Sequence, residues 1–365
     1  MYIPSLGSSD CWVKTLKTVH HLTPTFRPHD ALGSHVRALH DILVDSGCKS
    51  KIWSAKSGEM PPSQSIQKFK IREEGQDLLI YQAAIGSSLA DVALGHSAPL
   101  VVNYHNMTPA HFVDKWAPEM AQQLRRGRKQ LVQLAERADL ALTVSEYNAS
   151  ELREAGFKNI LVIPVLMGLK TITDSSKDSN HETQGARWLF VGRMVPNKAQ
   201  HDLVTALDAY RKLYDPKATL TLVGSGLPKY EEAIFELAKQ LNLLEAIKIK
   251  RGITEIEKEL EYQKADVYVS LSDHEGFGVP LLEAMSHGVP VAAFERAAIG
   301  ETVGSGGLLL ADKAPIEIAA AVYEVVSNSE SKELLIRSGH QRVHDFDPEA
   351  ISEQYLQALR PLLER

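Results

Sequence analysis

The chain alternates between short apolar runs and longer segments in which apolar residues recur every three or four positions. Short apolar runs indicate buried strands, and the longer pattern indicates amphipathic helices. In the first half of the chain, the predicted strands cover residues 18–22, 50–54, 77–81, 99–103, 139–144 and 160–164. Strands that alternate with helices in this way predict a parallel, doubly wound α/β sheet.

A polar stretch interrupts this alternation. Residues 171–185 show no apolar periodicity, which is typical of a linker. The alternation then resumes, with strands predicted at residues 187–191, 219–223, 246–250, 266–271, 289–294 and 307–310. The sequence therefore predicts two Rossmann-like domains, residues 1–170 and residues 186–348, on either side of the linker.

The stretch from residue 272 to residue 285 combines a strand end, a glycine turn and a helix start. Gly276 and Gly278 leave the backbone open to an anion, and a helix N-terminus carries unpaired N–H groups and a partial positive charge. Glu275 and Glu283 would repel a bare phosphate, so we expect them to accept hydrogen bonds from sugar hydroxyls. The alternative is a surface loop with a solvated glutamate at each end.

This stretch resembles the nucleotide-sugar site of the retaining family 4 glycosyltransferases. The likeness rests on Glu275 and Glu283 with seven residues between them, on the Glu-Gly-Phe-Gly core, and on the Ala-Met-Ser-His-Gly-Val-Pro-Val run that follows. The resemblance implies the GT-B fold, in which two Rossmann-like domains face a central cleft. It also implies that residues 349–365 pack on the N-terminal, acceptor-binding domain, while residues 186–348 bind the nucleotide-sugar donor.

The loop after the first strand of the second domain is similar to the family's pyrophosphate clamp. Arg193 can grip phosphate oxygens with two parallel hydrogen bonds, and Lys198 adds a compact positive charge. The family usually has glycine after this lysine, where the chain has Ala199. Loose surface cations are the alternative interpretation.

Two further positions match the family in the first domain. His105 lies in a segment similar to the strand-end histidine segment that faces the donor sugar, and it is the candidate catalytic histidine. A structural role at the strand end is the alternative for His105. Gly33 matches a glycine that approaches the donor pyrophosphate, although relatives often have a glycine pair there. An ordinary turn glycine before a helix predicted over residues 34–44 is the alternative for Gly33.

The resemblance thus assigns two sets of site residues. The catalytic set is His105, Arg193, Lys198 and Glu275. The donor-binding set is Gly33, Arg193, Lys198, Arg251, Gly252, Ile253, Glu275, Gly276, Phe277, Gly278, Val279 and Glu283. Within the second set, the backbone of residues 251–253 would contact the edge of the nucleobase, which leaves the base unidentified.

The net charge of −6 hides a more cationic first half. Basic side chains gather on a helix predicted over about residues 110–137: Arg125, Arg126, Arg128 and Lys129. They could attract anionic lipid or a pyrophosphate-linked acceptor. The alternative is a solvated helix face on which they pair with Glu119 and Glu136.

Composition narrows the function classes. No apolar run approaches the length of a membrane span and no signal peptide is apparent, so we expect a cytoplasmic protein, with peripheral contact at the inner face of the membrane as a variant. The two cysteines suggest neither a disulfide framework nor a metal site. No metal, other cofactor or nucleic-acid partner is expected.

The predicted activity is transfer of a hexose, without a metal, from a nucleoside diphosphate sugar to a hydroxyl acceptor, and the resemblance implies that this transfer retains the configuration of the sugar. Polysaccharide or glycolipid assembly is the expected context, with a small soluble acceptor as the alternative. A nucleotide-sugar epimerase and a nucleotide-sugar-binding protein without turnover are the competing classes.

Overall fold

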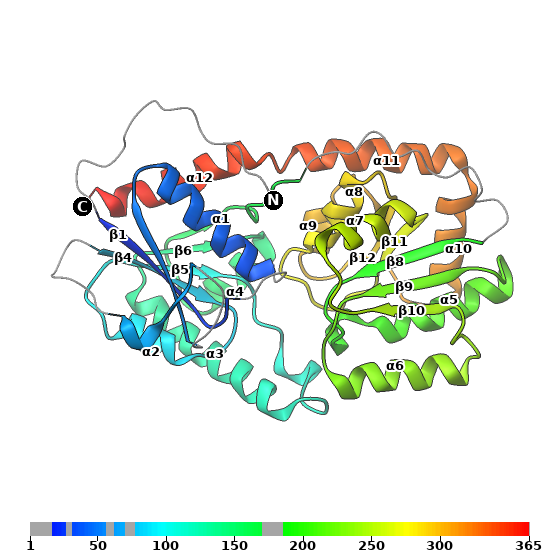
Figure 1. Cartoon of the computed structure of the whole chain (residues 1–365), viewed down its shortest axis with the longest axis horizontal. Coiled ribbons are helices and arrows are strands. Elements are labelled where there is room, and N and C mark those ends of the chain that lie inside the picture. The colour runs from blue at the N-terminus through cyan, green and yellow to red at the C-terminus, as the bar shows by residue number, and fades with distance from the viewer. Residues whose placement is uncertain (1–16, 27–30, 56–61, 70–76, 170–184, 365) are drawn as a thin grey trace. The chain divides into compact units, whose positions relative to one another are not determined.

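The computed structural model describes residues 17–26, 31–55, 62–69, 77–169 and 185–364. These residues form two compact units. The first contains the described parts of Met1–Ala110, Glu119–Gly168 and Phe346–Arg365, and the second contains those of His111–Pro118 and Leu169–Asp345 (Figure 1). The predicted linker lies outside the described residues except for Gly185.

The first unit is built on a seven-stranded parallel sheet. Its strands are β1 (Thr18–Thr23), β2 (Lys49–Ser54), β3 (Gln64–Ser65), β4 (Asp77–Ala83), β5 (Leu100–Tyr104), β6 (Leu140–Thr143) and β7 (Ile160–Val162). Its helices are α1 (Ala31–Asp45), α2 (Ser88–Leu94), α3 (Pro118–Arg137), α4 (Glu146–Glu154) and α12 (Pro348–Leu363). The strand order is β3-β2-β1-β4-β5-β6-β7, so the chain changes direction across the sheet between β1 and β4.

The second unit is built on a six-stranded parallel sheet. Its strands are β8 (Arg187–Val191), β9 (Thr219–Val223), β10 (Ile247–Lys250), β11 (Val267–Ser270), β12 (Val291–Phe294) and β13 (Leu308–Leu310). Its helices are α5 (Gln200–Leu213), α6 (Pro228–Gln240), α7 (Glu255–Lys264), α8 (Val279–Ser286), α9 (Ile299–Val303), α10 (Pro315–Ser327) and α11 (Ser329–His344). The order β10-β9-β8-β11-β12-β13 places the change of direction between β8 and β11.

The doubly wound α/β prediction is confirmed. Each predicted strand is present, with ends that differ by at most two residues. The strands are recognisable because strands of a parallel sheet covered on both faces are largely apolar, as in β4, where all seven residues are buried and residues 78–80 are aliphatic. The two-residue strand β3 has too few residues to produce such a pattern.

The long helix predicted from about residue 110 begins later than expected. A single 3-10 turn occupies Ala110–Phe112, and α3 starts only at Pro118. The backbone N–H groups of Trp116 and Ala117 both donate to the Val113 carbonyl oxygen, which closes a turn before the proline. Proline suits the first position of a helix and disfavours helical geometry in the residue before it, so α3 begins there.

The segment His111–Pro118 belongs to the second unit, although the sequence-based boundary placed all of residues 1–170 in the first domain. Two aromatic contacts account for this. The Trp116 ring meets the Tyr230 ring edge to face with centroids 5.2 Å apart, and the Phe112 and His274 ring centroids are 6.3 Å apart.

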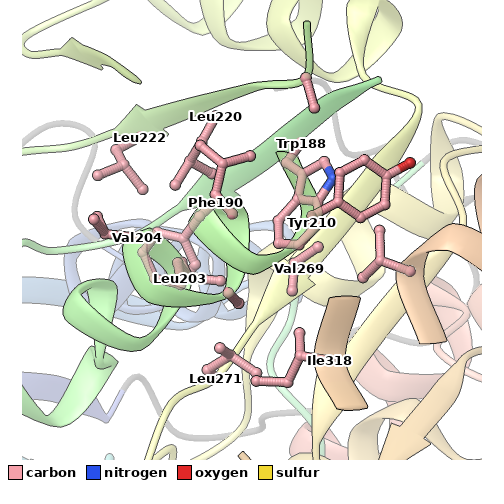
Figure 2. Close-up of a cluster of buried hydrophobic side chains, with 14 of the residues drawn as sticks. Trp188, Phe190, Leu203, Val204, Tyr210, Leu220, Leu222, Val269, Leu271 and Ile318 are labelled. Atoms are coloured by element: carbon pink, nitrogen blue, oxygen red, sulfur yellow. The ribbon is translucent and has the colours of Figure 1, made fainter. Parts of the chain in front are cut away.

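A buried aromatic and aliphatic cluster holds one face of the second sheet against α5, α6 and α10 (Figure 2). Trp188 on β8 meets Tyr210 on α5 edge to face, with ring centroids 5.1 Å apart. Val269 on β11 and Ile318 on α10 complete the contact, and all four side chains are at most 2% exposed. The packing fixes β8 and β11, whose carboxyl ends carry the predicted donor-site loops.

The last helix, α12, packs on the first unit. The Tyr355 hydroxyl group lies 3.1 Å from the Ile163 carbonyl oxygen and 3.2 Å from that of Pro164, and the side chain is fully buried. The Lys17 ammonium donates to the Leu362 carbonyl oxygen at 3.2 Å.

A close approach of α3 to the loop after β4 depends on two glycines. A Cβ atom on Gly127 would lie 2.6 Å from the Gly86 nitrogen and 2.7 Å from the Met107 sulfur. We expect Gly127→Ala to lower the free energy of unfolding by about 1–3 kcal/mol, because the Gly86 nitrogen belongs to the backbone and cannot swing aside as a flexible side chain can. Gly95→Ala is the matched control, since its Cβ would come no closer than 3.4 Å to the Asp91 oxygen. Denaturant titration followed by circular dichroism measures both, and equal stability of the two variants would contradict the prediction.

Candidate nucleotide-sugar site

The predicted donor residues gather where the second sheet changes direction. Arg193 and Lys198 follow β8, and Glu275 to Glu283 follow β11, which is hydrogen-bonded to β8. Ligands of open parallel sheets bind beyond the carboxyl ends of the strands at such a switch point, because the two loops diverge there and leave room. The sheet order therefore places these residues together independently of any motif.

The loop after β8 is held tightly by the neighbouring strand loop. The Gly192 N–H donates to the Val223 carbonyl oxygen at 2.9 Å, and the Met194 N–H donates to that of Ser225 at 3.2 Å. A Cβ atom on Gly226 would lie 1.9 Å from the Met194 oxygen, so only glycine permits this approach. The loop that carries the two predicted phosphate-binding cations is consequently rigid at its base.

Lys198 ends a 3-10 turn, and Arg193 lies five residues before it with an exposed side chain. The turn is linked to α5 by Ala199, whose φ of 51° is in the left-handed region, and whose side chain is fully buried. A left-handed backbone costs a non-glycine residue about 1–2 kcal/mol. Alanine at this position, where the family usually has glycine, therefore carries this cost, and burial leaves no space for a bigger side chain.

Lys198 and Glu275 form an ion pair between the loops after β8 and β11. The side chains are 19% and 15% exposed. Two hydrogen bonds also link these loops next to the ion pair. The Asp273 N–H donates to the Asn197 carbonyl oxygen at 2.8 Å, and the Asn197 side-chain amide donates to the His274 carbonyl oxygen at 3.2 Å. The structure thus brings a predicted phosphate-binding cation and a predicted sugar-binding carboxylate into direct contact.

The glycine turn between the two glutamates has the geometry expected of an open helix start. Gly278 is the N-cap of α8 with a φ of 98°, and no side chain caps this end of the helix. Proline lies within the first turn, at Pro280. Phe277 is buried, and its carbonyl oxygen accepts a hydrogen bond from the Thr302 hydroxyl at 2.5 Å. The side chain of Phe277 therefore anchors the turn, while Gly276 and Val279 are half-buried beside it.

Glu283 lies in the second turn of α8, and two residues of α7 hold its carboxylate. The Lys258 ammonium donates to Oε1 at 2.8 Å and the Tyr262 hydroxyl donates to Oε2 at 2.7 Å. Burial, followed by the charge of Glu283, raises the pKa of Tyr262 well above its usual value. Each carboxylate oxygen keeps a further lone pair, so Glu283 can still accept hydrogen bonds from a pair of ligand hydroxyls.

Lys258 and Tyr262 are functional candidates that the sequence did not reveal. They lie four residues apart on α7 and so share one helix face. Burial would lower the pKa of Lys258, but the carboxylates of Glu283 and Glu255 outweigh it and raise the pKa. The spacing was visible in the sequence, whereas the contact with Glu283 depends on how α7 packs beside α8.

Both predicted carboxylates lie near one buried phenol. Burial raises the pKa of Tyr268 well above its usual value, and the charges of Glu275 and Glu283 raise it further. The Tyr268 hydroxyl group donates to the Val191 carbonyl oxygen at 3.2 Å, at the end of β8. One side chain of β11 thus lies within electrostatic range of both carboxylates and contacts the strand that leads to Arg193.

The predicted nucleobase segment lies two strands away from β8, after β10. The Arg251 guanidinium donates to Oε2 of Glu231 at 2.8 Å, and Oε1 of the same carboxylate accepts from the Gly226 N–H at 2.7 Å. Gly252 has a φ of 61°, and a Cβ atom added to it would have no neighbour within 4 Å. Ile253 is half-buried. Glu231 therefore connects this segment to the loop beside Met194.

Gly33 and His105 belong to the first unit. Gly33 is the third residue of α1 and is buried, so it lies inside the helix and not in a turn before it. The expected helix start at residue 34 was wrong, because the helix begins at Ala31. At the third position of α1, the Gly33 N–H is one of the first four of the helix, which have no acceptor within the helix, so a pyrophosphate contact there stays a prediction.

His105 directly follows β5 and its ring contacts a buried polar network. Its Nε2 lies 2.6 Å from Oε1 of Gln82, which also accepts a hydrogen bond from the Asn103 side-chain amide at 3.1 Å. Burial lowers the pKa of His105 well below its usual value, so the imidazole is neutral at pH 7. Because a carboxamide oxygen only accepts, Nε2 carries the proton and Nδ1 remains the acceptor. His105 is thus suited to hydrogen bonding and not to carrying positive charge.

The loop that carries His105 is held by residues that the sequence placed elsewhere. Arg128, assigned to the basic cluster, donates to Oε1 of Glu151 at 3.0 Å and to the Met107 carbonyl oxygen at 2.5 Å. Glu151 Oε2 accepts from the Tyr104 hydroxyl at 2.7 Å. Asn106 between them has a φ of 74°, an uncommon conformation for a non-glycine residue. Arg128 is therefore a structural residue of this loop.

The remaining basic cluster carries less available charge than its sequence indicates. Arg126 pairs with Asp91 at 2.8 Å, so the partners of Arg126 and Arg128 differ from the expected Glu119 and Glu136. Along the described parts of the chain, no helix has the length and apolarity to cross a membrane. Membrane contact and a cytoplasmic location stay predictions.

Among the described residues, there is no group of three or more histidine, cysteine, aspartate or glutamate side chains that could hold a metal ion. The chain contains one Asp-x-Asp spacing, at Asp345 and Asp347. Asp345 pairs with Arg342 at 2.7 Å, and Asp347 caps α12 by accepting from the Ala350 N–H at 2.9 Å. Both carboxylates of this spacing have structural roles.

Comparison with known proteins covers both parts of the chain. Residues 18–165 match the model of Glycosyltransferase Family 4, and residues 171–342 match that of Glycosyl transferases group 1. The chain is 30% identical over 185 residues to a glycogen synthase of Mycobacterium tuberculosis, a match that spans 49% of this chain and 44% of that protein. The chain therefore spans less than half the length of this curated relative.

Two solved structures are similar over almost the whole chain. Sucrose-phosphate synthase from Thermosynechococcus elongatus gives a TM-score of 0.77 at 20% identity, covering 95% of this chain and 99% of that one. Anabaena HepE in complex with UDP and glucose gives a TM-score of 0.74 at 18% identity, covering 93% and 98%. With two parallel sheets of this order and family matches on both, the chain belongs to the family 4, or group 1, glycosyltransferases of the GT-B fold.

Proposed function

We propose that the chain is a retaining glycosyltransferase that moves a hexose from a nucleoside diphosphate sugar to a hydroxyl acceptor. The observation that carries the proposal is the Lys198–Glu275 ion pair at the switch point of the second sheet. A diphosphate needs fixed cations, and sugar and ribose hydroxyls need acceptors. Arg193, on the same loop as Lys198, supplies a second cation for the diphosphate. Glu283, on the helix that follows Glu275, supplies a second acceptor for hydroxyl groups.

In this proposal the second unit binds the donor and the first unit binds the acceptor. Arg193, Lys198 and the uncapped start of α8 hold the diphosphate, and residues 251–253 contact the nucleobase. Glu283 accepts hydrogen bonds from the ribose hydroxyls, with Lys258 and Tyr262 fixing its carboxylate. Glu275 binds the transferred sugar. His105 of the first unit contributes a neutral hydrogen-bonding ring.

The transfer step needs charge stabilisation at the leaving group. The bond between the anomeric carbon and the β-phosphate oxygen breaks, and the acceptor oxygen bonds to the same carbon from the same face. The acceptor proton moves to the departing phosphate, so the configuration is retained and no protein nucleophile is required. Arg193 and Lys198 stabilise the negative charge that develops on the diphosphate. Stabilisation of developing charge by fixed groups of this kind accounts for most of the rate acceleration in many enzymes.

The acceptor class is open to two proposals. A glycogen synthase acts on a polysaccharide, whereas a sucrose-phosphate synthase makes a small soluble product, and this chain is similar to both. We favour polysaccharide or glycolipid assembly, with a small soluble acceptor as the alternative. HepE was solved with UDP and glucose, so UDP-glucose is the first donor to test.

A donor screen tests the proposal without knowledge of the acceptor. We expect one of UDP-, GDP- and ADP-linked hexoses to raise the melting temperature and to be hydrolysed slowly, releasing nucleoside diphosphate. Formation of an epimer would indicate an epimerase instead, and binding without turnover in the presence of varied acceptors would indicate a binding protein. Loss of activity with EDTA that Mg²⁺ restores would contradict the metal-independent mechanism.

A further inference from the structure

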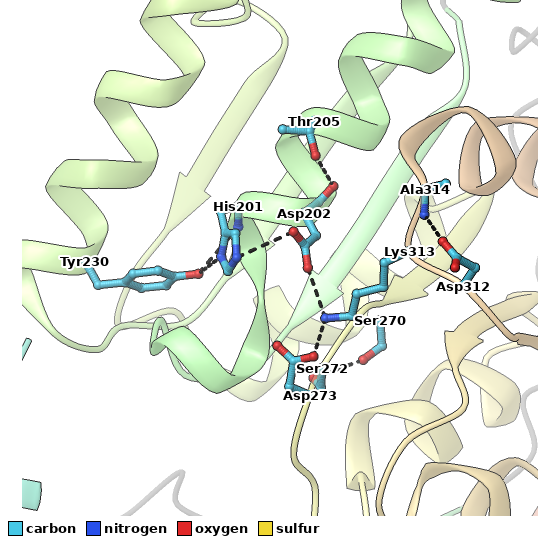
Figure 3. Close-up of polar contacts among 10 residues, drawn as sticks. All are labelled: His201, Asp202, Thr205, Tyr230, Ser270, Ser272, Asp273, Asp312, Lys313 and Ala314. Carbon is cyan, nitrogen blue, oxygen red and sulfur yellow. Dashed lines mark hydrogen bonds and ion pairs between the residues drawn. The ribbon is translucent and has the colours of Figure 1, made fainter. Parts of the chain in front are cut away.

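Lys313 connects two carboxylates beside the proposed donor site (Figure 3). Its ammonium nitrogen lies 2.6 Å from Oδ1 of Asp273 and 3.0 Å from Oδ2 of Asp202. The same nitrogen lies over the Phe294 ring, 4.9 Å from its centroid. The Lys313 side chain is 19% exposed. This lysine lies in the segment between β13 and α10 and contacts α5, the loop after β11, and β12.

The two carboxylates belong to the segments that carry the proposed catalytic pair. Asp202 lies in the first turn of α5, four residues after Lys198. Asp273 lies two residues before Glu275 on the loop after β11, and its N–H donates to the Asn197 carbonyl oxygen at 2.8 Å. The contacts of Lys313 therefore join the segment that presents Lys198 to the segment that presents Glu275.

The aspartates need a cation in this position. Each is about a quarter to a third exposed, at 27% for Asp202 and 34% for Asp273. Without Lys313, two carboxylates that now share one ammonium would repel each other and separate the two loops. They would also add uncompensated negative charge beside a site that binds an anion. The attraction of Lys313 to both opposes each of these effects.

One of the two carboxylates is fixed from a second direction. Oδ1 of Asp202 lies 3.5 Å from Nε2 of His201, and Nδ1 of the same ring lies 2.8 Å from the Tyr230 hydroxyl. Asp202 is therefore anchored to α6 as well as to Lys313. Asp273, on the loop that carries Glu275, is the partner whose position depends more on Lys313.

We propose that Lys313 is a positioning residue that sets the geometry of Lys198 and Glu275 through Asp202 and Asp273. The inference rests on the proposed function, since it concerns the same donor site. Lys313 has no contact with substrate in this proposal. Its removal displaces the two loops that make such contacts, and misplacement of reacting groups by about 1 Å can lower a rate by about 100-fold.

The test compares three variants. It uses the nucleoside diphosphate hexose identified in the donor screen as the donor, and the corresponding nucleoside diphosphate for binding measurements. We expect Lys313→Met to lower kcat at least 10-fold and to weaken nucleoside diphosphate binding several-fold. Lys313→Arg should recover most of the kcat, because a guanidinium can still bridge two carboxylates. Lys212→Met is the matched control, since it removes another Lys–Asp ion pair of the same unit, at a site where Lys212 is 68% exposed. It should retain wild-type kcat and binding.

The outcomes separate this inference from the proposed function. Failure of the wild-type protein to bind or turn over any donor overturns both. A wild-type protein that is active while Lys313→Met keeps its kcat and binding within twofold overturns only the positioning role. If Lys313→Met is too unstable to assay, Asp273→Asn gives the second measurement. It keeps a polar side chain and removes one of the two charges, and it must lower kcat with an unchanged melting temperature for the inference to stand.

Discussion

Replacing Lys198 with methionine is expected to lower sugar transfer by about 100- to 1,000-fold while the fold remains intact. The ammonium group of Lys198 reaches from the loop after β8 to the loop after β11, where it pairs with Glu275. Methionine preserves much of the volume of the side chain and removes the charge. The negative charge of the leaving diphosphate would then be stabilised by Arg193 and the helix start alone.

Glu275→Gln should separate the two roles of the ion pair. Without donor, Glu275 neutralises Lys198, and a bound diphosphate competes for the same ammonium. Glutamine frees the lysine, so we expect nucleoside diphosphate to bind at least as tightly as in the wild-type protein. Transfer should nevertheless fall by about 100-fold, since a carboxylate that strengthens its hydrogen bonds to the sugar in the transition state is lost.

Isothermal titration with nucleoside diphosphate and a transfer or hydrolysis assay measure the two effects. Lys239→Met is the control, because Lys239 is 61% exposed and pairs loosely with Glu236 at 3.9 Å. Near wild-type turnover in Lys198→Met would refute the assignment of the diphosphate site. Equal weakening of nucleoside diphosphate binding in Lys198→Met and Glu275→Gln would show that the pair only holds the two loops together.

Most strands were predictable because the central strands are largely buried and therefore rich in apolar residues. The end points of β8 and β9 agree with the prediction from the chain. Helix starts are less well encoded. The pattern of α3 continues backwards through Phe112 and Trp116, whose half-buried side chains contact rings of the second unit and are not part of the helix.

The site was predictable where neighbours in sequence are neighbours in space. Glu275, the glycine turn and Glu283 lie on one continuous stretch, and the strand order brings Lys198 beside them. Contacts between distant elements left no local signal. Lys258 reaches Glu283 from α7, and Lys313 reaches Asp273 from the far edge of the sheet.

The burial and protonation state of several histidines of the first unit could not be predicted from a sequence pattern either. His21 and His35 are fully or almost fully buried, and burial lowers their pKa to about 3 and about 4. Nδ1 of His35 accepts a hydrogen bond from the Leu166 N–H at 3.2 Å. A proton on this nitrogen would place two donors face to face. The hydrogen bond to His35 and the burial of both rings therefore require neutral imidazoles.

Acidification from pH 7.5 to pH 5 is expected to destabilise the first unit by several kcal/mol while the second unit remains folded. A histidine whose pKa is lowered by folding is neutral in the native state and takes up a proton only on unfolding. Its contribution to stability is present above pH 6.5, its unfolded pKa, and is lost progressively as the pH falls toward 3 or 4. His105 acts in the same direction. A loss of several kcal/mol is a large fraction of the stability of an ordinary domain.

The second unit should respond at lower pH, because the groups whose pKa is lowered among its described residues are three carboxylates, Glu257, Glu261 and Asp266, and a single histidine, His340. Burial would raise the pKa of Asp266, but its bonds to Arg187 outweigh burial and lower the pKa, so this contribution is lost only below about pH 4. Pulsed hydrogen exchange at fixed pH after incubation at pH 5 should show β1 and β4 losing protection before β9 and β11. His35→Gln should flatten the pH dependence, whereas His344→Gln, an exposed control on α11, should leave it unchanged. Simultaneous loss of protection in both units, with the same pH midpoint in all three proteins, would show that the buried histidines do not set the acid limit of the fold.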